Sequence, residues 1–459
     1  MKTEILKVDP LNIALERSKL RYAADVIRGG GLVAFPTETV YGLGADALNP
    51  KAVEKIFKAK GRPADNPLIS HIADISSLPL IAVEVPEKAA VIMRRFWPGP
   101  LTLVLKKAPG VPGIVTAGLG TAAVRMPSHP AALALIEESG TPLAAPSANT
   151  SGKPSPTSAE HVIADLSGKV DIIIDSGIPA IGIESTVVDV TSDPPVILRP
   201  GWVDIQMLAE YLPGIIYLEE QGQDRGRFCV PKGTGEGGSS DHTEHHGGRC
   251  AGNGGGVGED ASSVRMGNDL SAISSSSSSN DEIKEKLIQS PKSPGMKYRH
   301  YAPEALFEIA GGRDEREIAG KIRELCRAYF AQGMNVGILS TVQTDSEYAD
   351  LVRKFTKRAN HRADQKTDNM GGLKSDHKTD HTAGHVPDNI ETKIKTPAPG
   401  GVEVICLGDR KEAAGIAASL YYALREMDRR GADVILAEQI PEDGIGFAVM
   451  NRMMKAAVK

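Results

Sequence analysis

Residues 14–36 read ALERSKLRYAADVIRGGGLVAFP, and this stretch indicates the fold class of the first part of the chain. A helix is predicted over residues 14–28, with an apolar face formed by Ile13, Leu20, Ala24 and Ile27. Three glycines at 29–31 end this helix, and a short buried strand at 32–35 is halted by Pro36. A helix that leads directly into a buried strand is typical of an α/β domain.

The same mixture of helices and strands continues along the chain, so we expect one α/β domain over residues 10–215. Apolar periodicity predicts further helices at 51–60, 86–96, 130–139, 158–166 and 204–211. Short apolar runs predict strands at 101–105, 122–125, 171–174 and 185–190.

Two polar stretches interrupt the second part of the chain. Residues from about 221 to 290 lack apolar periodicity and cannot bury enough surface to offset their ordering entropy, so we predict a disordered insert within a linker at 216–303. A second polar insert covers about 358–400. Residues 304–459 otherwise alternate strands and helices, at 306–309, 315–331, 336–340, 346–356, 402–407, 411–430, 434–437 and 445–457. This alternation predicts a smaller, parallel α/β domain.

Bulk properties narrow the class of protein. The 459 residues suffice for two or three domains, and the net charge of −5 argues against a protein dominated by nonspecific nucleic-acid binding. No run approaches ~20 apolar residues, so no membrane-spanning helix is expected, and the N-terminus lacks the apolar core of a secretion signal. Cys229 and Cys250 lie in low-complexity sequence and Cys326 and Cys406 in apolar runs. No disulfide framework is implied, and we expect a cytoplasmic protein.

Two short motifs predict an anion-binding site. Lys60-Gly61-Arg62 places two cations one residue apart, a spacing that can clamp a polyphosphate. Ser147-Ala148-Asn149 lies in a loop of small residues, whose backbone N–H groups can approach the same anion. Solvated charges at a helix end and simple turn residues are the alternatives for the two motifs taken singly.

Taken together, these motifs resemble the threonylcarbamoyl-AMP synthases of the YrdC-like family, in the long two-domain form. The phosphate-site pattern of that family is KxR followed much later by SxN, and both are present without substitution. Matching stretches follow in the same order: FPTETVYGLG (35–44), DNPLI (65–69) with His71, FWPGPLT (96–102), AVRMP (123–127), ESTVVD (184–189) and RPG (199–201). The resemblance covers residues 14–202 and resumes at SPGMKYRHYAP (293–303), which resembles the linker of the long form.

The resemblance implies a fold and a reaction. The fold is a twisted YrdC-like α/β domain with a concave cleft, followed by a smaller Rossmann-like parallel α/β domain. The reaction joins L-threonine, bicarbonate or CO2, and ATP with Mg2+ into L-threonylcarbamoyladenylate and pyrophosphate, the first step of forming N6-threonylcarbamoyladenosine in tRNA. The implied partners are a downstream tRNA threonylcarbamoyl transferase complex and, as an open question, tRNA itself; no membrane is expected.

The resemblance also implies which residues form the site. Catalytic roles fall on Lys60, Arg62, Ser147 and Asn149. Contacts to ATP are implied for these four and for Asn66, Thr121, Ser155, Arg199 and Tyr301, with Tyr298 or Tyr301 as a lid. Contacts to L-threonine are implied for Thr39, His71, Arg125, Ala145 and Ser185. For Arg125, an ion pair with a protein carboxylate is the alternative, and no residue is expected to ligate a metal.

Two other functions are kept as alternatives. An RNA-binding module would use a concave basic face, but Arg125, Ser185 and His71 have no purpose in binding an RNA backbone. An enzyme that transfers a carbamoyl group from carbamoyl phosphate would need zinc-finger and acylphosphatase-like segments, and neither is visible. Two histidine clusters in the inserts are interpreted as incidental polarity: His242, His245, His246 with Cys250, and His377, His381, His385.

Overall fold

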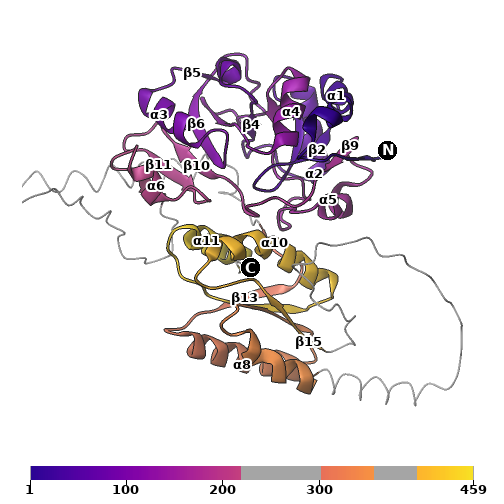
Figure 1. Ribbon diagram of the computed structural model, residues 1–459, viewed down its shortest axis with the longest axis vertical. Helices are drawn as coiled ribbons and strands as arrows, with labels where there is room; N and C mark the ends of the chain where they lie inside the picture. The colour runs from indigo at the N-terminus through magenta and orange to yellow at the C-terminus, as the bar shows by residue number, and fades with distance from the viewer. Residues whose placement is uncertain (1, 219–300, 356–400, 458–459) are drawn as a thin grey trace, which may run out of the picture. The chain divides into compact units, whose positions relative to one another are not determined.

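The computed structural model describes residues 2–218, 301–355 and 401–457, and these form two sheets flanked by helices (Figure 1). All described residues belong to one compact unit. Most of the predicted linker, both polar inserts, Tyr298, Cys229, Cys250 and the two histidine clusters lie outside the described residues. The domain boundaries near residues 215 and 304 therefore stay predictions.

The larger sheet mixes parallel and antiparallel strands, in the order β1-β9-β2-β3-β8-β4-β7-β6-β10-β11-β12, with β5 paired to β6. Its strands are β1 (Glu4–Lys7), β2 (Val33–Pro36), β3 (Tyr41–Asp46), β4 (Ile69–His71), β5 (Ala82–Val83), β6 (Leu101–Lys107), β7 (Thr121–Arg125), β8 (Leu143–Ala144), β9 (Ile172–Asp175), β10 (Thr186–Asp189), β11 (Val196–Arg199) and β12 (Ile216–Tyr217). The strands predicted at 32–35, 101–105, 122–125, 171–174 and 185–190 are confirmed within one or two residues at their ends.

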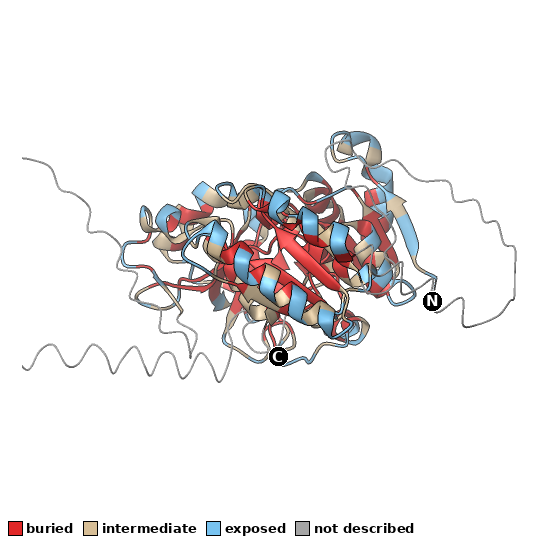
Figure 2. Cartoon of the chain, turned by 90° about the horizontal axis from the view of Figure 1, so that it is seen from below, coloured by how far each residue is buried: buried red, intermediate tan, exposed pale blue. Residues whose placement is uncertain are grey.

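The helices around this sheet lie where apolar periodicity predicted them. They are α1 (Ile13–Arg28), α2 (Pro50–Lys60), α3 (Glu87–Phe96), α4 (Pro130–Ser139), α5 (Ala159–Leu166) and α6 (Ile205–Ala209). A 3-10 helix, η1 (Ile75–Leu80), was not among the predicted elements. Helices α1 and α4 share a buried core with β2 and β9 on one side of the sheet. Figure 2 shows buried residues concentrated in the strands and exposed residues on the outer faces of the helices.

The second sheet is entirely parallel, as the alternation of strands and helices predicted. Its order is β13-β16-β14-β15, with bounds β13 (Leu306–Ala310), β14 (Val336–Ser340), β15 (Val402–Cys406) and β16 (Val434–Glu438). Helix α8 (Glu315–Ala331), with the 3-10 helix η2 (Asp345–Tyr348), covers one face. Helices α10 (Ala413–Arg429) and α11 (Ile445–Ala457) cover the other.

The two sheets meet through helices α10 and α11. Their buried side chains share one apolar cluster with Val40, Ile181 and Ile183 from the larger-sheet region and with Tyr301. Helices α10 and α11 cover one face of the small sheet. Through them, the small sheet is joined to the larger-sheet region at Val40, Ile181 and Ile183. Within the described parts of the chain, no helix is both long and apolar enough to cross a bilayer.

Candidate active site

The turn between β2 and β3 holds a pair of threonine hydroxyls in place. Thr37 Oγ1 donates to the carbonyl oxygen of Val40 at 2.7 Å, and it lies 2.8 Å from Thr39 Oγ1. Both threonines are buried, and the strand pairing of Pro36 with Tyr41 closes the turn. The hydroxyl of Thr39 is thereby fixed at the rim of the sheet.

Helix α2 ends at the first anion motif. The side chain of Asn49 caps its N-terminus, and Gly61 ends it in the left-handed region at φ 62°, a conformation that glycine adopts without strain. Lys60, the last helical residue, is buried, and its Nζ donates to the carbonyl oxygens of Ser147 and Asn149. Burial, assisted by the charge of Arg62, holds the pKa of Lys60 well below its ordinary value.

Arg62 follows the glycine and takes a different direction. Its side chain lines a cavity, while Nη2 donates to the carbonyl oxygens of Asn66 and Pro67 at 3.3 Å each. The two cations of the motif therefore face different partners: Lys60 holds the loop that contains Ser147 and Asn149, and Arg62 faces the cavity.

Strand pairing brings His71 and Arg125 side by side. Strands β4 and β7 are parallel, with His71 opposite Arg125. Arg125 donates from Nη1 to Thr39 Oγ1 at 3.0 Å and from Nε to the Gly99 carbonyl oxygen at 3.2 Å. Burial and the neighbouring charge of Arg125 lower the pKa of His71 to about 3, so its ring is neutral.

Arg125 also pairs with a protein carboxylate. Its Nη2 lies 2.6 Å from Glu38 Oε1, and both side chains are buried. The ion pair with a protein carboxylate, which was the alternative interpretation of Arg125, is thus present in the structure. The two directed hydrogen bonds of Arg125 go to Gly99 and Thr39, whereas Nη2 forms an ion pair with Glu38 but no directed hydrogen bond. A guanidinium carries five N–H groups, so Arg125 retains N–H groups that a ligand can accept.

Ser185 lies between two residues that fix its hydroxyl. Thr102 Oγ1 is 2.8 Å from Ser185 Oγ, and Arg199 donates from Nη2 to the same oxygen at 3.1 Å. Arg199 Nε also donates to the Ser185 carbonyl oxygen at 3.0 Å. Burial lowers the pKa of Arg199, but a guanidinium keeps its charge in a protein interior.

Glu184 connects this wall of the site to the second sheet. It accepts hydrogen bonds from Ser155 Oγ, from Tyr421 Oη at 2.9 Å and from Arg452 Nε at 2.8 Å. Burial favours its neutral form, but the charges of Arg452 and Arg199 outweigh burial and lower the pKa of Glu184. Tyr301 stacks on Tyr421 with ring centroids 5.6 Å apart.

One cavity collects most of these side chains. Of the predicted site residues, those that line it are Thr39, Arg62, His71, Arg125, Ala145, Ser147, Ser185, Arg199 and Tyr301. Three others support its walls from behind: Lys60, Asn149 and Ser155, each bonded to neighbouring protein groups. Asn66 is fully buried, with a side-chain amide that has no hydrogen-bond partner among the described residues. Thr121 begins β7, about 13 Å along the strand from Arg125.

Four residues that contribute to the site were not among the predicted ones: Glu38, Glu184, Tyr421 and Arg452. Glu38 and Glu184 lie inside matched motifs, next to residues that were selected. Arg452 interrupts the apolar face of α11, and a charged residue at a buried helical position is a signal for a buried partner.

The chemistry available to the cavity is anion binding. Three arginines line it, Arg62, Arg125 and Arg199, together with the hydroxyls of Thr39, Ser147 and Ser185. Among the described lining residues, Glu184 is the one carboxylate, and three hydrogen-bond donors occupy it. His71 is neutral and buried. Such a site can bind a carboxylate and a polyphosphate and hold them in register.

The fold is thus α/β, with a cavity rich in groups that can bind anions, and comparisons with known proteins show the family. The family model described as "Telomere recombination" (Sua5_yciO_yrdC) matches residues 25–201, and the model described as "Threonylcarbamoyl-AMP synthase, C-terminal domain" matches 268–458. A threonylcarbamoyl-AMP synthase of Pyrococcus abyssi is 40% identical over 96% of this chain and 95% of its own. One of Bacillus subtilis is 39% identical over 100% of this chain and 98% of its own.

A solved structure extends the likeness to three dimensions. The crystal structure of P. abyssi Sua5 complexed with L-threonine is 38% identical and superposes with a TM-score of 0.67, covering 100% of this chain and 98% of that one. The chain belongs to the threonylcarbamoyl-AMP synthase family, in its long form with both domains.

Proposed function

We propose that this protein makes L-threonylcarbamoyladenylate from L-threonine, bicarbonate or CO2, and ATP, with release of pyrophosphate. The observation that carries the proposal is the cavity in which Arg62, Arg125 and Arg199 converge with the hydroxyls of Ser147 and Ser185. Synthase relatives that align over almost the whole chain support it.

Arg125 is the proposed ligand for the carboxylate of L-threonine. Its Nη2 group, which makes an ion pair but no directed hydrogen bond within the protein, suits a carboxylate. Thr39, Ser185 and the neutral His71 line the same cavity. The P. abyssi relative that was solved in complex with L-threonine has the same fold at 38% identity, which supports an amino-acid pocket here.

Arg62, Ser147 and Arg199 are the proposed ligands for the phosphates of ATP, with Asn66, Thr121, Ser155 and Tyr301 as further contacts. The threonine amine first captures CO2 and loses a proton, which gives a carbamate. A carbamate oxygen then attacks the α-phosphorus of ATP, and the bond from that phosphorus to pyrophosphate breaks. Negative charge grows on the leaving group, so the arginines stabilise this step most. Lys60 and Asn149 act in this proposal by holding the loop of Ser147.

Magnesium enters this proposal as part of the substrate. Mg2+ is commonly held by phosphate oxygens, water and one or two carboxylates. The described part of the chain has no cluster of three histidine, cysteine or acidic side chains that would hold the ion by itself. We further propose that the product passes to a tRNA threonylcarbamoyl transferase complex in the cytoplasm, as the first step of forming N6-threonylcarbamoyladenosine in tRNA.

The test is pyrophosphate release by the full-length protein with MgATP, bicarbonate and a panel of amino acids. We expect release only when L-threonine and bicarbonate are both present, and its loss in Arg62→Ala. Folded protein that releases pyrophosphate without amino-acid dependence, or not at all, would contradict the proposal. RNA binding that does not need L-threonine would then favour the RNA-binding alternative.

A further inference from the structure

The loop of residues 147–155 is held closed by its own side chains and by Lys60. Asn149 accepts from Ser147 Oγ, and its Nδ2 donates to the carbonyl oxygens of Thr150 at 2.8 Å and Lys153 at 2.9 Å. Lys60 Nζ donates to the Asn149 carbonyl oxygen at 2.6 Å. The loop carries Ser147 and Ser155, so its shape decides where these hydroxyls lie.

Asp165, on helix α5, fixes the middle of this loop. Its Oδ2 accepts the backbone N–H of Thr150 at 3.1 Å, and its side chain is 3% exposed. A buried carboxylate is stable only when paired with charge or several donors. The charge that pairs with it comes from a residue more than 250 positions further along the chain.

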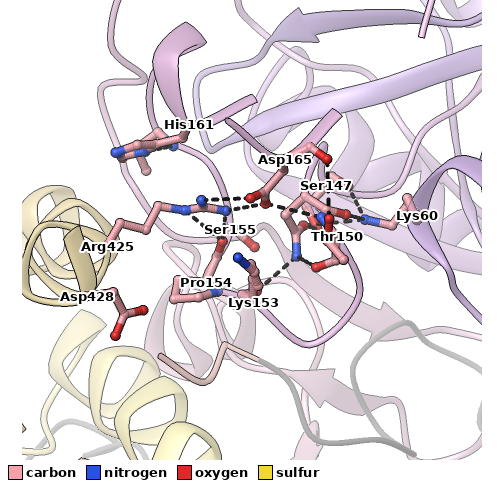
Figure 3. Close-up of polar contacts among 12 residues, drawn as sticks. Lys60, Ser147, Thr150, Lys153, Pro154, Ser155, His161, Asp165, Arg425 and Asp428 are labelled. Atoms are coloured by element: carbon pink, nitrogen blue, oxygen red, sulfur yellow. Dashed lines mark hydrogen bonds and ion pairs between the residues drawn. The ribbon is translucent and has the colours of Figure 1, made fainter. Parts of the chain in front are cut away.

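That residue is Arg425 on helix α10, which packs on the second sheet. Its Nη2 lies 2.8 Å from Asp165 Oδ2, and its Nε donates to the Pro154 carbonyl oxygen at 3.1 Å. Figure 3 shows the guanidinium between Asp165 and Pro154, with Lys60 and Ser147 on the far side of Asp165. Arg425 thus holds the loop at two points, directly at Pro154 and through Asp165 at Thr150.

We propose that Arg425 is a positioning residue for the anion loop: through Asp165 and Pro154, the C-terminal domain sets the loop geometry on which nucleotide binding depends. Arg425 does not line the cavity, so it acts through the loop and not on the substrate. This inference rests on the proposed function for the identity of its anion, the polyphosphate of ATP. It gives helix α10 a role in the synthase site itself.

Two variants that change the local charge in opposite directions can distinguish loop positioning from a long-range electrostatic effect. Arg425→Ala removes a positive charge near the anion site, and Asp165→Asn removes a negative one. Long-range electrostatics alone would weaken nucleotide binding in the first and strengthen it in the second. Loop positioning predicts weaker binding in both, by about ten-fold. The double variant should lose less affinity than the sum of the two single losses, because the two residues share the contact between Arg425 and Asp165.

The matched control is Arg429→Ala. Arg429 lies one turn further along α10, its side chain is 60% exposed, and it pairs with Glu426 of the same helix. Affinity of the full-length proteins for the magnesium complex of a non-hydrolysable ATP analogue is measured by titration calorimetry, with L-threonine as a second ligand. We expect Arg429→Ala to bind both like wild type, and Arg425→Ala to lose affinity for the analogue but not for L-threonine.

Each outcome bears on the proposal. Equal losses for both ligands in Arg425→Ala, or analogue binding by Asp165→Asn that matches or exceeds wild type, would overturn it. If Arg425→Ala does not fold, Arg425→Lys keeps the charge but loses the forked contact, and the same loss of analogue affinity is expected. Wild-type protein that binds the analogue but releases no pyrophosphate from MgATP in the presence of L-threonine and bicarbonate would contradict the proposed function alone, and the comparison of variants would still stand.

Discussion

Arg452 Nε lies 2.8 Å from Glu184 Oε2, and the two side chains are 0% and 8% exposed. This ion pair joins helix α11 to Glu184. The next residue, Ser185, lines the cavity. A second contact to Glu184 comes from Tyr421 on α10. The C-terminal domain is therefore bonded directly to the wall of the candidate site.

Removal of Arg452 should destabilise the protein strongly. Arg452→Ala leaves Glu184 buried without its nearest counter-charge, a change that typically costs about 3–5 kcal/mol of unfolding free energy. Chemical denaturation followed by circular dichroism measures the loss. The double variant Glu184→Gln/Arg452→Met removes both charges of the pair and should recover part of this loss. A single variant as stable as wild type would show that the pair does not hold the domains together.

Substitution of Lys60 should mainly lower the stability of the protein, whereas substitution of Arg62 should mainly weaken nucleotide binding. Lys60→Met leaves the buried carbonyl oxygens of Ser147 and Asn149 without a donor, which should cost about 1–3 kcal/mol of unfolding free energy. Arg62→Ala should cost about 1 kcal/mol or less but weaken binding of an ATP analogue by about ten- to one-hundred-fold. Thermal melts and calorimetry measure the two effects, with the exposed Lys58→Ala as control. A large loss of stability in Arg62→Ala together with an unchanged stability in Lys60→Met would contradict the roles assigned to these two side chains.

Arg125→Lys should abolish tight L-threonine binding while leaving ATP-analogue binding nearly unchanged. A lysine cannot reproduce the two-pronged contact of a guanidinium with a carboxylate. We expect affinity for L-threonine to fall by at least about ten-fold in equilibrium titrations. The matched control is Arg94→Lys, because Arg94 is 67% exposed. Unchanged L-threonine affinity in Arg125→Lys would leave Arg125 with a structural role, through its contacts with Gly99, Thr39 and Glu38.

Stability in acid should depend on His71. The folded protein keeps this ring neutral down to a pKa of about 3, whereas the ordinary value is 6.5. Between these pH values the unfolded chain binds the extra proton, so unfolding free energy falls as pH drops, by up to about 1.4 kcal/mol per pH unit for this group. Above pH 6.5 the ring is neutral in both the folded and the unfolded chain, so His71 no longer makes the unfolding free energy depend on pH. The variant His71→Gln removes this dependence, and denaturation across the pH range should give a flatter curve than wild type; parallel curves would contradict the buried neutral histidine.

Regular elements were predictable because their periodicity is long enough to read. Helices α1 and α10 and the parallel strands β14 and β16 were expected within one or two residues of their observed ends. The short strands were not, since two or three residues, as in β4 and β8, are too few to show alternation. Their pairing depends on neighbours far away in the chain.

The site was predictable as a set of motifs but not as a geometry. The KxR and SxN motifs meet, as the resemblance implied, yet the sequence carries no sign that Lys60 turns to backbone carbonyls while Arg62 faces the cavity. Arg452 on the apolar face of α11 indicates that a buried partner exists, but the sequence does not say which residue, because contacts between residues more than 200 positions apart leave no local pattern. Only the packing of the two sheets brings Arg425 to Asp165.

Isotope-labelled carbon gives the most direct test of the proposed reaction. Full-length protein is incubated with MgATP, L-threonine and isotope-labelled bicarbonate, and the nucleotide product is identified by mass spectrometry. The proposed reaction predicts one adduct that contains AMP, threonine and the labelled carbon, formed together with pyrophosphate. An AMP–threonine adduct without the label, or ATP cleavage with no adduct, would contradict it.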